Sequence, residues 1–462
     1  MTKKTKLYIK RTVLLIFAFL LEGILGFLLI NGIANHDLAK SKIIILIIIL
    51  MLLIPVALMA LLFALTFKNK ARRASRVKSS GIIITDAGKN TKKIDKNLSE
   101  SSTSERFCML SAIDRKRNGY GHSSYKQNVT LEEFCDNFRN YAAYRHGLYY
   151  DIEDIRRFIA GMSVSHMLIL QGMSGTGKTS LAHAIGSFVD NSSTIIPVQP
   201  MWKERTDLVG YYNEFTRRFN ETLLLTKMYE ANYSKDIYVT VLDEMNIARV
   251  EYYFAEFLSL LELPNPEERY LDVVSDKWDN DPIQLKDGRI KLPTNMWFIG
   301  TANNDDSTFL ISDKVYDRAM ILDLDQKTER FVAPPTDKMV ISAEDFEALV
   351  ESARKEYEIS YRNRKRLEAF DEYLIAHFHV TFGNRIMKQI LTYIPVYIAC
   401  GGEELFALDD ILSKKVIRKL ESQNPIYFKN AADGLIAYMD DLFGAENMTL
   451  CKEHIKRILR NA

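Results

Sequence analysis

The stretch Gly172-Met-Ser-Gly-Thr-Gly-Lys178-Thr179 decides the fold of the central part of this chain. An apolar run, Met167 to Leu170, comes directly before it, and a helical pattern, Ser180 to Val189, follows it. This order predicts a buried strand, a glycine-rich loop and a helix, which is the setting that the sequence G-x-x-x-x-G-K-[ST] needs in order to bind phosphate. A Gly/Ser-rich turn, together with an ordinary acidic strand end further along the chain, is the alternative interpretation.

The residue types of this loop suit a nucleoside triphosphate with Mg²⁺. Glycines let the backbone approach the phosphates closely, so that several N–H groups and the positive end of the following helix can bind them. Lys178 can reach the β- and γ-phosphates, and the Thr179 hydroxyl can coordinate Mg²⁺. The predicted nucleotide-binding residues of the loop are Gly172, Met173, Ser174, Gly175, Thr176, Gly177, Lys178, Thr179 and Ser180.

An acidic strand end, Tyr238-Val-Thr-Val-Leu-Asp243-Glu244, follows about sixty-five residues later. Asp243 is expected to bind the nucleotide-associated Mg²⁺ together with Thr179, directly or through water. Glu244 is placed to orient or deprotonate an attacking water. The two sequences together predict hydrolysis of the bound nucleotide, with Glu244 as a catalytic residue.

Short apolar segments alternate with helical segments through the centre of the chain. The predicted strands are residues 167–171, 194–198, 237–242, 295–300 and 319–324. Such alternation predicts an α/β fold, a parallel sheet with helices on both faces. Two helices are expected before the first strand, because Thr130-Leu-Glu-Glu133 is a capping box and Asp151 is a good N-cap.

Four regions follow from these patterns. Residues 1–67 are expected to form a two-helix membrane anchor and residues 68–129 a basic and polar linker. Residues 130–325 form the predicted α/β core. After Gln326 helical patterns dominate, so residues 326–462 are expected to form a helical lid.

Two long apolar runs, Val13 to Ile30 and Ile43 to Phe67, are each long enough to cross a bilayer as a helix. Lys and Arg concentrate in residues 1–12 and 68–78, so the positive-inside rule predicts a multi-pass protein of the inner (plasma) membrane. Both termini and the nucleotide-binding core would face the cytoplasm. A cleaved signal peptide is the alternative for the first run, and it leaves that orientation unchanged.

Charge and cysteine content limit the possible partners. Residues 1–78 carry a formal balance of +11, which leaves about −9 for the rest of a chain whose total is +2. This acidic remainder argues against a broad basic surface for DNA, although it allows a small basic region in a pore. The four cysteines, Cys108, Cys135, Cys400 and Cys451, have spacings that predict neither a zinc site nor a disulfide.

The strings Asp243-Glu-Met-Asn-Ile-Ala-Arg249 and Gly300-Thr-Ala-Asn-Asn-Asp-Asp-Ser-Thr308, taken with the glycine-rich loop, resemble the AAA+ ATPases. The resemblance covers roughly residues 130–420 and lies in the branch that includes MoxR, dynein-related modules and McrB-type motors. It implies a P-loop core with a C-terminal helical lid, ATP with Mg²⁺, and a homo-oligomeric ring, expected to be a hexamer. Residues Trp202 to Phe215 look like the insertion that follows the first helix in this branch.

The same resemblance implies three further site residues. Asn303 matches the sensor that positions the attacking water. Arg318 matches the arginine finger that reaches the γ-phosphate held by a neighbouring subunit, and Arg385 looks like the lid arginine that senses phosphate in its own subunit. The alternative for Asn303 is a plain turn former. For Arg318 it is a surface cation at a helix end, and for Arg385 it is an ion pair within the lid.

One departure concerns the nucleotide. The McrB-type proteins carry a pattern near M-N-x-x-D-R-S where this chain has Ala302 to Thr308, and the difference favours ATP over GTP. The expected function is a membrane-anchored ATPase ring that remodels a macromolecular partner. A motor subunit of a restriction-like defence system, acting on DNA with a separate nuclease, is the first alternative. A scaffold that binds nucleotide without turnover is the second.

Overall fold

The computed structural model describes residues 105–303, 308–325 and 328–461. The chain divides into two units, Met1–Asp95 and Lys96–Ala462, and the described residues belong to the second. Both apolar runs predicted to cross a membrane lie outside the described residues. Among the helices that the model describes, none combines the length and the apolar character that a membrane crossing requires.

A five-stranded parallel sheet lies at the centre of the described unit. Its strands, in the order in which they pair, are β10 (Met320–Asp323), β1 (Met167–Gly172), β9 (Met296–Asn303), β5 (Tyr238–Asp243) and β2 (Thr194–Pro197). All four pairings are parallel, so the carboxyl ends of the strands meet at one edge. The predicted α/β core with a parallel sheet is therefore confirmed.

Two separate cores cover the two faces of this sheet. Successive side chains of a strand point to opposite faces, and β1 accordingly sends Leu168 and Leu170 into one core and Met167 and Ile169 into the other. The strand is buried along its whole length because both faces are covered. This burial explains why the sequence of β1 is continuously apolar up to Leu170.

Helices α4 (Leu131–His146), α5 (Ile152–Val164) and α6 (Lys178–Phe188) pack on the first face. The predicted helix starts are confirmed. Thr130 Oγ1 accepts a hydrogen bond from the N–H of Glu133 at 3.1 Å, and Asp151 Oδ1 accepts one from the N–H of Glu153 at 2.9 Å. These side chains bind N–H groups that the first helical turn leaves without a backbone partner.

The second face carries two inserted antiparallel sheets. A hairpin of β3 (Gly210–Asn213) and β4 (Arg218–Glu221) overlaps the predicted insertion, Trp202 to Phe215, and extends beyond it. The other sheet pairs β6 (Tyr270–Asp272), β8 (Arg289–Lys291) and β7 (Leu285–Lys286). Strands of two or three residues are too short to produce an alternating pattern, so the sequence gives no sign of this second sheet.

Residues 105–129, assigned from the sequence to the linker, are folded against the hairpin. Phe107 is fully buried and stacks on Phe219 of β4 with ring centroids 4.9 Å apart. Helix α3 (Met109–Arg115) begins on the Glu221 carboxylate, which accepts hydrogen bonds from the N–H groups of residues 108–110. The part of the chain that leads in from the N-terminal region is thus attached to the inserted sheets.

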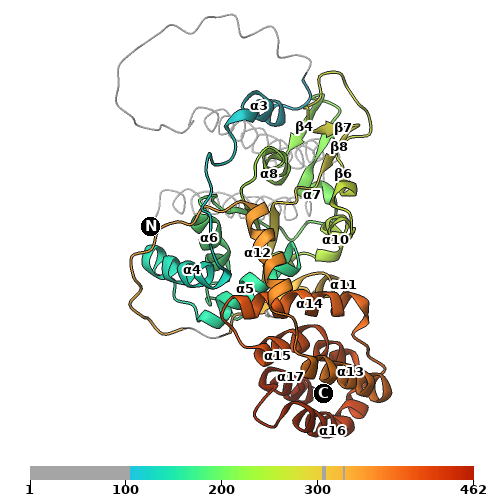
Figure 1. Ribbon diagram of the computed structural model, residues 1–462. Coiled ribbons are helices and arrows are strands. Elements are labelled where there is room, and N and C mark those ends of the chain that lie inside the picture. Colours follow the sequence, from blue (N-terminus) through green and yellow to red (C-terminus); the bar gives the residue numbers. More distant parts are fainter. Residues whose placement is uncertain (1–104, 304–307, 326–327, 462) are drawn as a thin grey trace, which may run out of the picture. The chain divides into compact units, whose positions relative to one another are not determined.

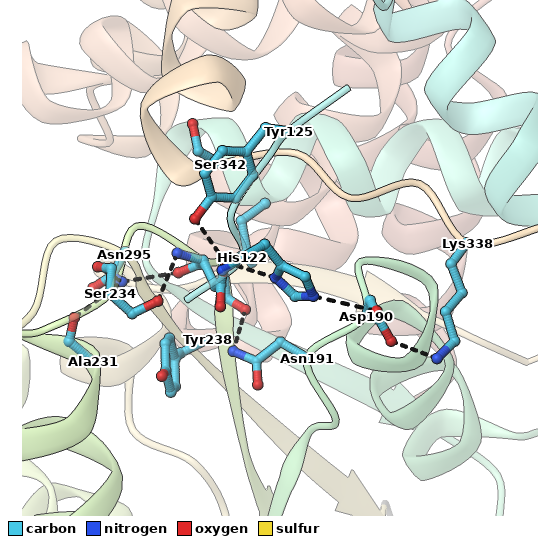
Figure 2. Close-up of polar contacts among 12 residues, drawn as sticks. His122, Tyr125, Asp190, Asn191, Ala231, Ser234, Tyr238, Asn295, Lys338 and Ser342 are labelled. Atoms are coloured by element: carbon cyan, nitrogen blue, oxygen red, sulfur yellow. Dashed lines mark hydrogen bonds and ion pairs between the residues drawn. The ribbon is translucent and has the colours of Figure 1, made fainter. Parts of the chain in front are cut away.

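A polar network connects the next part of this segment to the core. His122 Nδ1 lies 2.9 Å from Asp236 Oδ1, and its Nε2 lies 3.2 Å from Asp190 Oδ2. Figure 2 shows the imidazole pointing toward Asp190, which also pairs with Lys338, while the Tyr125 hydroxyl donates to Asp236. The network joins the segment before α4 to the residues that precede β5.

The C-terminal region is helical, as predicted. Its helices are α12 (Ala343–Glu356), α13 (Tyr361–Phe378), α14 (Gly383–Ala399), α15 (Glu404–Lys415), α16 (Pro425–Phe443) and α17 (Thr449–Asn461). Helix α14 packs against α5, α12 and α15, while α17 packs against α15 and α16, and α13 packs against α16 (Figure 1). Phe346 of α12 contacts Trp297 of β9, with ring centroids 5.8 Å apart, so the first helix after the sheet belongs to the core.

Candidate nucleotide-binding site

The glycine-rich loop connects β1 to α6 at the carboxyl edge of the sheet. Gly172 has a φ of 137°, and a Cβ there would lie 2.5 Å from the carbonyl oxygen of Leu324. Gly177 has a φ of 92°, and a Cβ there would lie 3.0 Å from the Tyr150 hydroxyl, which donates a hydrogen bond to the Gly177 carbonyl. Both positions require glycine, because a side chain would be strained and crowded.

Lys178 lies beneath the loop at the first position of α6. Its ammonium donates hydrogen bonds to the carbonyl oxygens of Gly172 at 2.9 Å and Met173 at 2.8 Å, and the residue is buried. The lysine therefore spans the concave side of the loop, where backbone N–H groups and the α6 dipole favour an anion. A phosphate group bound there would lie within reach of the ammonium.

A cluster of two hydroxyl side chains and one carboxylate lies next to this lysine. Its members come from α6, β5 and β9. Asp243 Oδ1 accepts hydrogen bonds from the hydroxyls of Thr179 at 2.7 Å and Thr301 at 2.9 Å. The structure thus brings the two predicted Mg²⁺ ligands, Thr179 and Asp243, into contact. Carboxylate and hydroxyl oxygens are the donors that Mg²⁺ prefers, so these residues fit a nucleotide-bound Mg²⁺ ion.

Glu244 adopts a left-handed conformation, with φ 52° and ψ 47°. This conformation is uncommon for a residue that carries a Cβ, and such strain concentrates at functional sites. The Glu244 N–H donates to Thr301 Oγ1 at 2.9 Å, and the side chain is exposed. The exposed carboxylate directly follows Asp243, at the carboxyl edge of the sheet where the loop also lies.

Asn303 ends β9 directly beside the start of the loop, since it pairs in register with Gly172. The buried Asn246 fixes this strand end: its Nδ2 donates to the Asn303 carbonyl at 2.9 Å and to Thr308 Oγ1 at 3.0 Å. Residues 304–307 lie outside the described part of the chain. The predicted sensor position is therefore adjacent to both the loop and the Asp243–Glu244 strand end.

Thr301 was not singled out from the sequence. A single threonine within an apolar strand is common, and only its register, beside both Asp243 and Glu244, reveals that it connects them. Its hydroxyl accepts a hydrogen bond from the Glu244 N–H and donates one to Asp243, so it acts as both acceptor and donor.

A charged cavity of about 650 Å³ adjoins the loop, between α5, the end of β10 and the helices α15 and α17. Asp325 lies at its border, with Oδ1 only 2.8 Å from where a Cβ of Gly172 would be. Burial raises the pKa of Asp154, and burial lowers the pKa of Lys414, which is paired with Asp323. Charged side chains of both signs therefore line the space next to the loop.

The two predicted arginines lie away from this site. Arg318 precedes β10, and Met320 pairs with Leu168, so Arg318 is at the amino edge of the sheet while the loop is at the carboxyl edge. Arg318 Nη2 lies 3.2 Å from Glu262 Oε2, and Arg385 Nη2 lies 2.6 Å from Glu262 Oε1. The structure therefore brings Arg385 to Arg318 rather than to the loop of its own chain.

The parallel sheet, the glycine-rich loop and the Thr179–Asp243 contact define the class of protein, a P-loop nucleotide-binding protein. More particularly, residues 167–319 match the family model described as the AAA domain of the dynein-related subfamily. This domain implies binding of a nucleotide with Mg²⁺.

Among solved structures, a full-length MCM homologue from Methanopyrus kandleri is similar, with a TM-score of 0.35 and 12% sequence identity. The similarity covers 60% of this chain and 58% of that one, so the chain spans less than two thirds of the homologue. No curated protein matches the sequence.

Proposed function

We propose that this chain is an ATPase that hydrolyses ATP with Mg²⁺ in a ring of identical subunits, with six as the expected number. The observation that carries the proposal is the contact of Asp243 with Thr179 and Thr301 beside the loop that holds Lys178. In this proposal Lys178 binds the β- and γ-phosphates, and Thr179 and Asp243 hold the Mg²⁺, which draws negative charge from the phosphates. Glu244 and Asn303 position the attacking water.

The proposed ring follows from the two arginines. Arg318 and Arg385 lie at the sheet edge opposite the loop, too far from the nucleotide of their own subunit to contact it. In a ring, the amino edge of one subunit can face the loop of the next, because head-to-tail contacts close into cyclic assemblies. Both arginines would then bind the γ-phosphate of the neighbour, where an arginine finger contributes about 10³-fold or more in rate.

The work of the proposed ring is remodelling of a macromolecular partner at a membrane. The two apolar runs at residues 13–30 and 43–67 would anchor each subunit in the bilayer with its AAA domain in the cytoplasm. On the inserted hairpin, Phe215 is fully exposed and Tyr211 is about half exposed, so the hairpin offers apolar contacts to a partner. The acidic balance of the chain after residue 78 favours a protein partner over DNA.

The catalytic proposal is tested by ATP hydrolysis with the full 462-residue chain in detergent. Lys178→Ala should abolish nucleotide binding, because it removes the cation from the loop. Glu244→Gln should bind ATP but not hydrolyse it, since an amide cannot accept the proton of the attacking water. Lys355→Ala, which removes an exposed lysine of α12, should leave hydrolysis unchanged. The absence of nucleotide binding by the unmutated chain at high protein concentration would refute the proposal.

The membrane proposal has a separate test. The full chain, expressed in bacterial cells, should sediment with membranes through a carbonate wash and dissolve only in detergent, because two buried apolar helices resist extraction at high pH. Recovery of the full chain in the soluble fraction would contradict this part of the proposal and leave the ATPase part untouched.

A further inference from the structure

We propose that Glu262 is a positioning residue that holds Arg318 and Arg385 together as one pair for the γ-phosphate of the neighbouring subunit. The inference rests on the proposed function, because it assumes that both arginines act on a neighbour's nucleotide. It adds a residue that lies outside the glycine-rich loop, the acidic strand end and the sensor strand.

The contacts place one carboxylate between two guanidinium groups. Glu262 follows α10 (Ala255–Leu261) as its C-cap residue, and each of its oxygens faces a different arginine, at 3.2 Å for Arg318 and 2.6 Å for Arg385. Arg318 Nη1 also donates to Ser259 Oγ of the same helix at 3.3 Å. One turn of α10 and its cap residue therefore set the position of the Arg318 side chain.

The cations around Glu262 make its negative charge important for keeping the two arginines together. The three residues border a cavity of about 570 Å³, and Glu262 is the single carboxylate among the described residues that line it. The cationic residues of the lining are Arg269, Arg318, Arg354, Arg385 and Lys388. Arg354 pairs separately with Glu351 at 3.1 Å, which leaves Arg318 and Arg385 to share Glu262. Without it, two like charges would lie next to each other in a cationic cavity and repel.

The position of Arg385 in its helix is a second reason why a carboxylate is needed beside it. It is the third residue of α14, and the positive end of the helix dipole disfavours a cation in the first turn. Glu262 compensates for both the dipole and the neighbouring guanidinium. Arg385 has half of its side chain exposed, and Arg318 has 28% exposed. Each arginine is thus held by Glu262 while part of it stays open to an anion from outside the subunit.

Glu262 also connects two arginines that come from different parts of the fold. Arg385 belongs to the helical C-terminal region, whereas Arg318 belongs to the turn between α11 (Asp313–Tyr316) and β10. Since both arginines lie against the same carboxylate, Glu262 sets the separation of the two guanidinium groups. The γ-phosphate of the neighbour then meets both guanidinium groups as one pair.

The experiment compares ATP hydrolysis by full-length variants at a protein concentration above that needed for assembly. Glu262→Gln keeps the shape of the side chain and removes its charge. We expect kcat to fall about 10-fold, with the KM for ATP changed less than 3-fold, because ATP is bound mainly by the loop of the other subunit. Glu256→Gln is the matched control, since Glu256 lies on the same helix and pairs with a different arginine, Arg205, at 3.0 Å. It should keep the unmutated kcat.

A mixing experiment separates positioning from a folding defect. Glu262→Gln subunits have an intact loop, and Lys178→Ala subunits have intact arginines and Glu262. A mixture of the two should regain activity above the sum of the separate proteins, because an intact loop then meets an intact arginine pair.

Three outcomes decide the matter. Activity regained in the mixture, with unchanged KM, supports the proposal. Unmutated kcat in Glu262→Gln, alongside a large loss in Arg318→Ala, overturns the role of Glu262 but leaves the proposed function standing. Unmutated kcat in both Arg318→Ala and Arg385→Ala overturns the proposed action on a neighbour, and the inference with it.

Discussion

At the scale of single residues, the site depends on side chains that hold other side chains. Thr301 accepts the N–H of Glu244 and donates to Asp243, so one hydroxyl joins the proposed Mg²⁺ ligand to the proposed base. Glu244 needs such support because its left-handed backbone is strained. Hydrolysis should therefore be sensitive to Thr301 although its hydroxyl faces protein groups.

Thr301→Val removes this hydroxyl and keeps the shape of the side chain. We expect ATP binding to persist and kcat to fall about 10-fold, which corresponds to about 1.4 kcal/mol of lost transition-state stabilisation. The physical reason is that Asp243 and Glu244 each lose a hydrogen bond that fixes their position. Thr301→Ser keeps the hydroxyl and should retain most of the activity in the same assay. Equal losses in the two variants would contradict this role of the hydroxyl.

His122 gives the folded chain a dependence on pH. Its hydrogen bond with Asp236, assisted by Asp190, raises the pKa of the imidazole above 6.5. Since the folded state has the higher pKa, the stabilisation is fully present below pH 6.5 and is lost as the pH rises through the raised value. The melting temperature of His122→Asn should fall furthest below the unmutated value at pH 6 and approach it at higher pH. An equal difference at every pH would contradict this linkage, and His379→Asn, at an exposed position, is the control.

At the scale of secondary-structure elements, α15 holds the turn that carries Arg318. The buried ammonium of Lys415 donates to the carbonyl oxygens of Tyr316 at 2.7 Å, Asp317 at 3.4 Å and Ala319 at 2.5 Å. From α14, Gln389 Nε2 donates to the Asp317 carbonyl at 3.2 Å. The backbone on both sides of the arginine is therefore fixed by the helical C-terminal region.

Lys415→Met should destabilise this connection, because it leaves buried carbonyl oxygens without a donor. A loss of about 2 kcal/mol is expected from the cost of unpaired buried acceptors, and it should lower the melting temperature by several degrees. Lys419→Met is the control, since Lys419 is partly exposed and lies 3.9 Å from Asp317. A melting temperature for Lys415→Met equal to that of the control would show that these hydrogen bonds contribute no net stability.

At the scale of the whole molecule, the described unit has its nucleotide loop and its arginine pair at opposite edges of one sheet. In the proposed ring, a second copy supplies the arginines that complete the site. The α/β core explains the separation, since the loop follows the carboxyl end of β1, while Arg318 precedes the amino end of β10.

This arrangement predicts hydrolysis that depends on assembly. Specific activity should rise with protein concentration as subunits associate. Lys178→Ala and Arg318→Ala subunits should each be inactive alone, and an equal mixture should regain up to about a quarter of the unmutated activity if neighbours pair at random. Activity that is independent of concentration, together with no gain on mixing, would contradict action between subunits.

Much of the core could be predicted because its patterns are local. Each of the five sheet strands is visible as a short apolar segment, and β1, buried on both faces, is the clearest of them. The loop could be identified because its glycines, Lys178 and Thr179 are adjacent in sequence. The three-stranded inserted sheet and the folding of residues 105–129 could not be predicted, because both depend on contacts with distant residues such as Asp281, whose carboxylate binds Arg106 at 2.7 Å.

The nucleotide-binding loop, the acidic strand end and the α/β class could be predicted from the sequence alone. They depend on residue types at fixed spacing along a strand and at the start of a helix. Contacts between distant elements, in contrast, determine where the arginines lie. Glu262, Arg318 and Arg385 come from separate elements, and no spacing predicts that one carboxylate contacts both arginines. Strand order and the packing of α14 and α15 bring them together, which is why the position of Arg385 differs from the one that the resemblance implied.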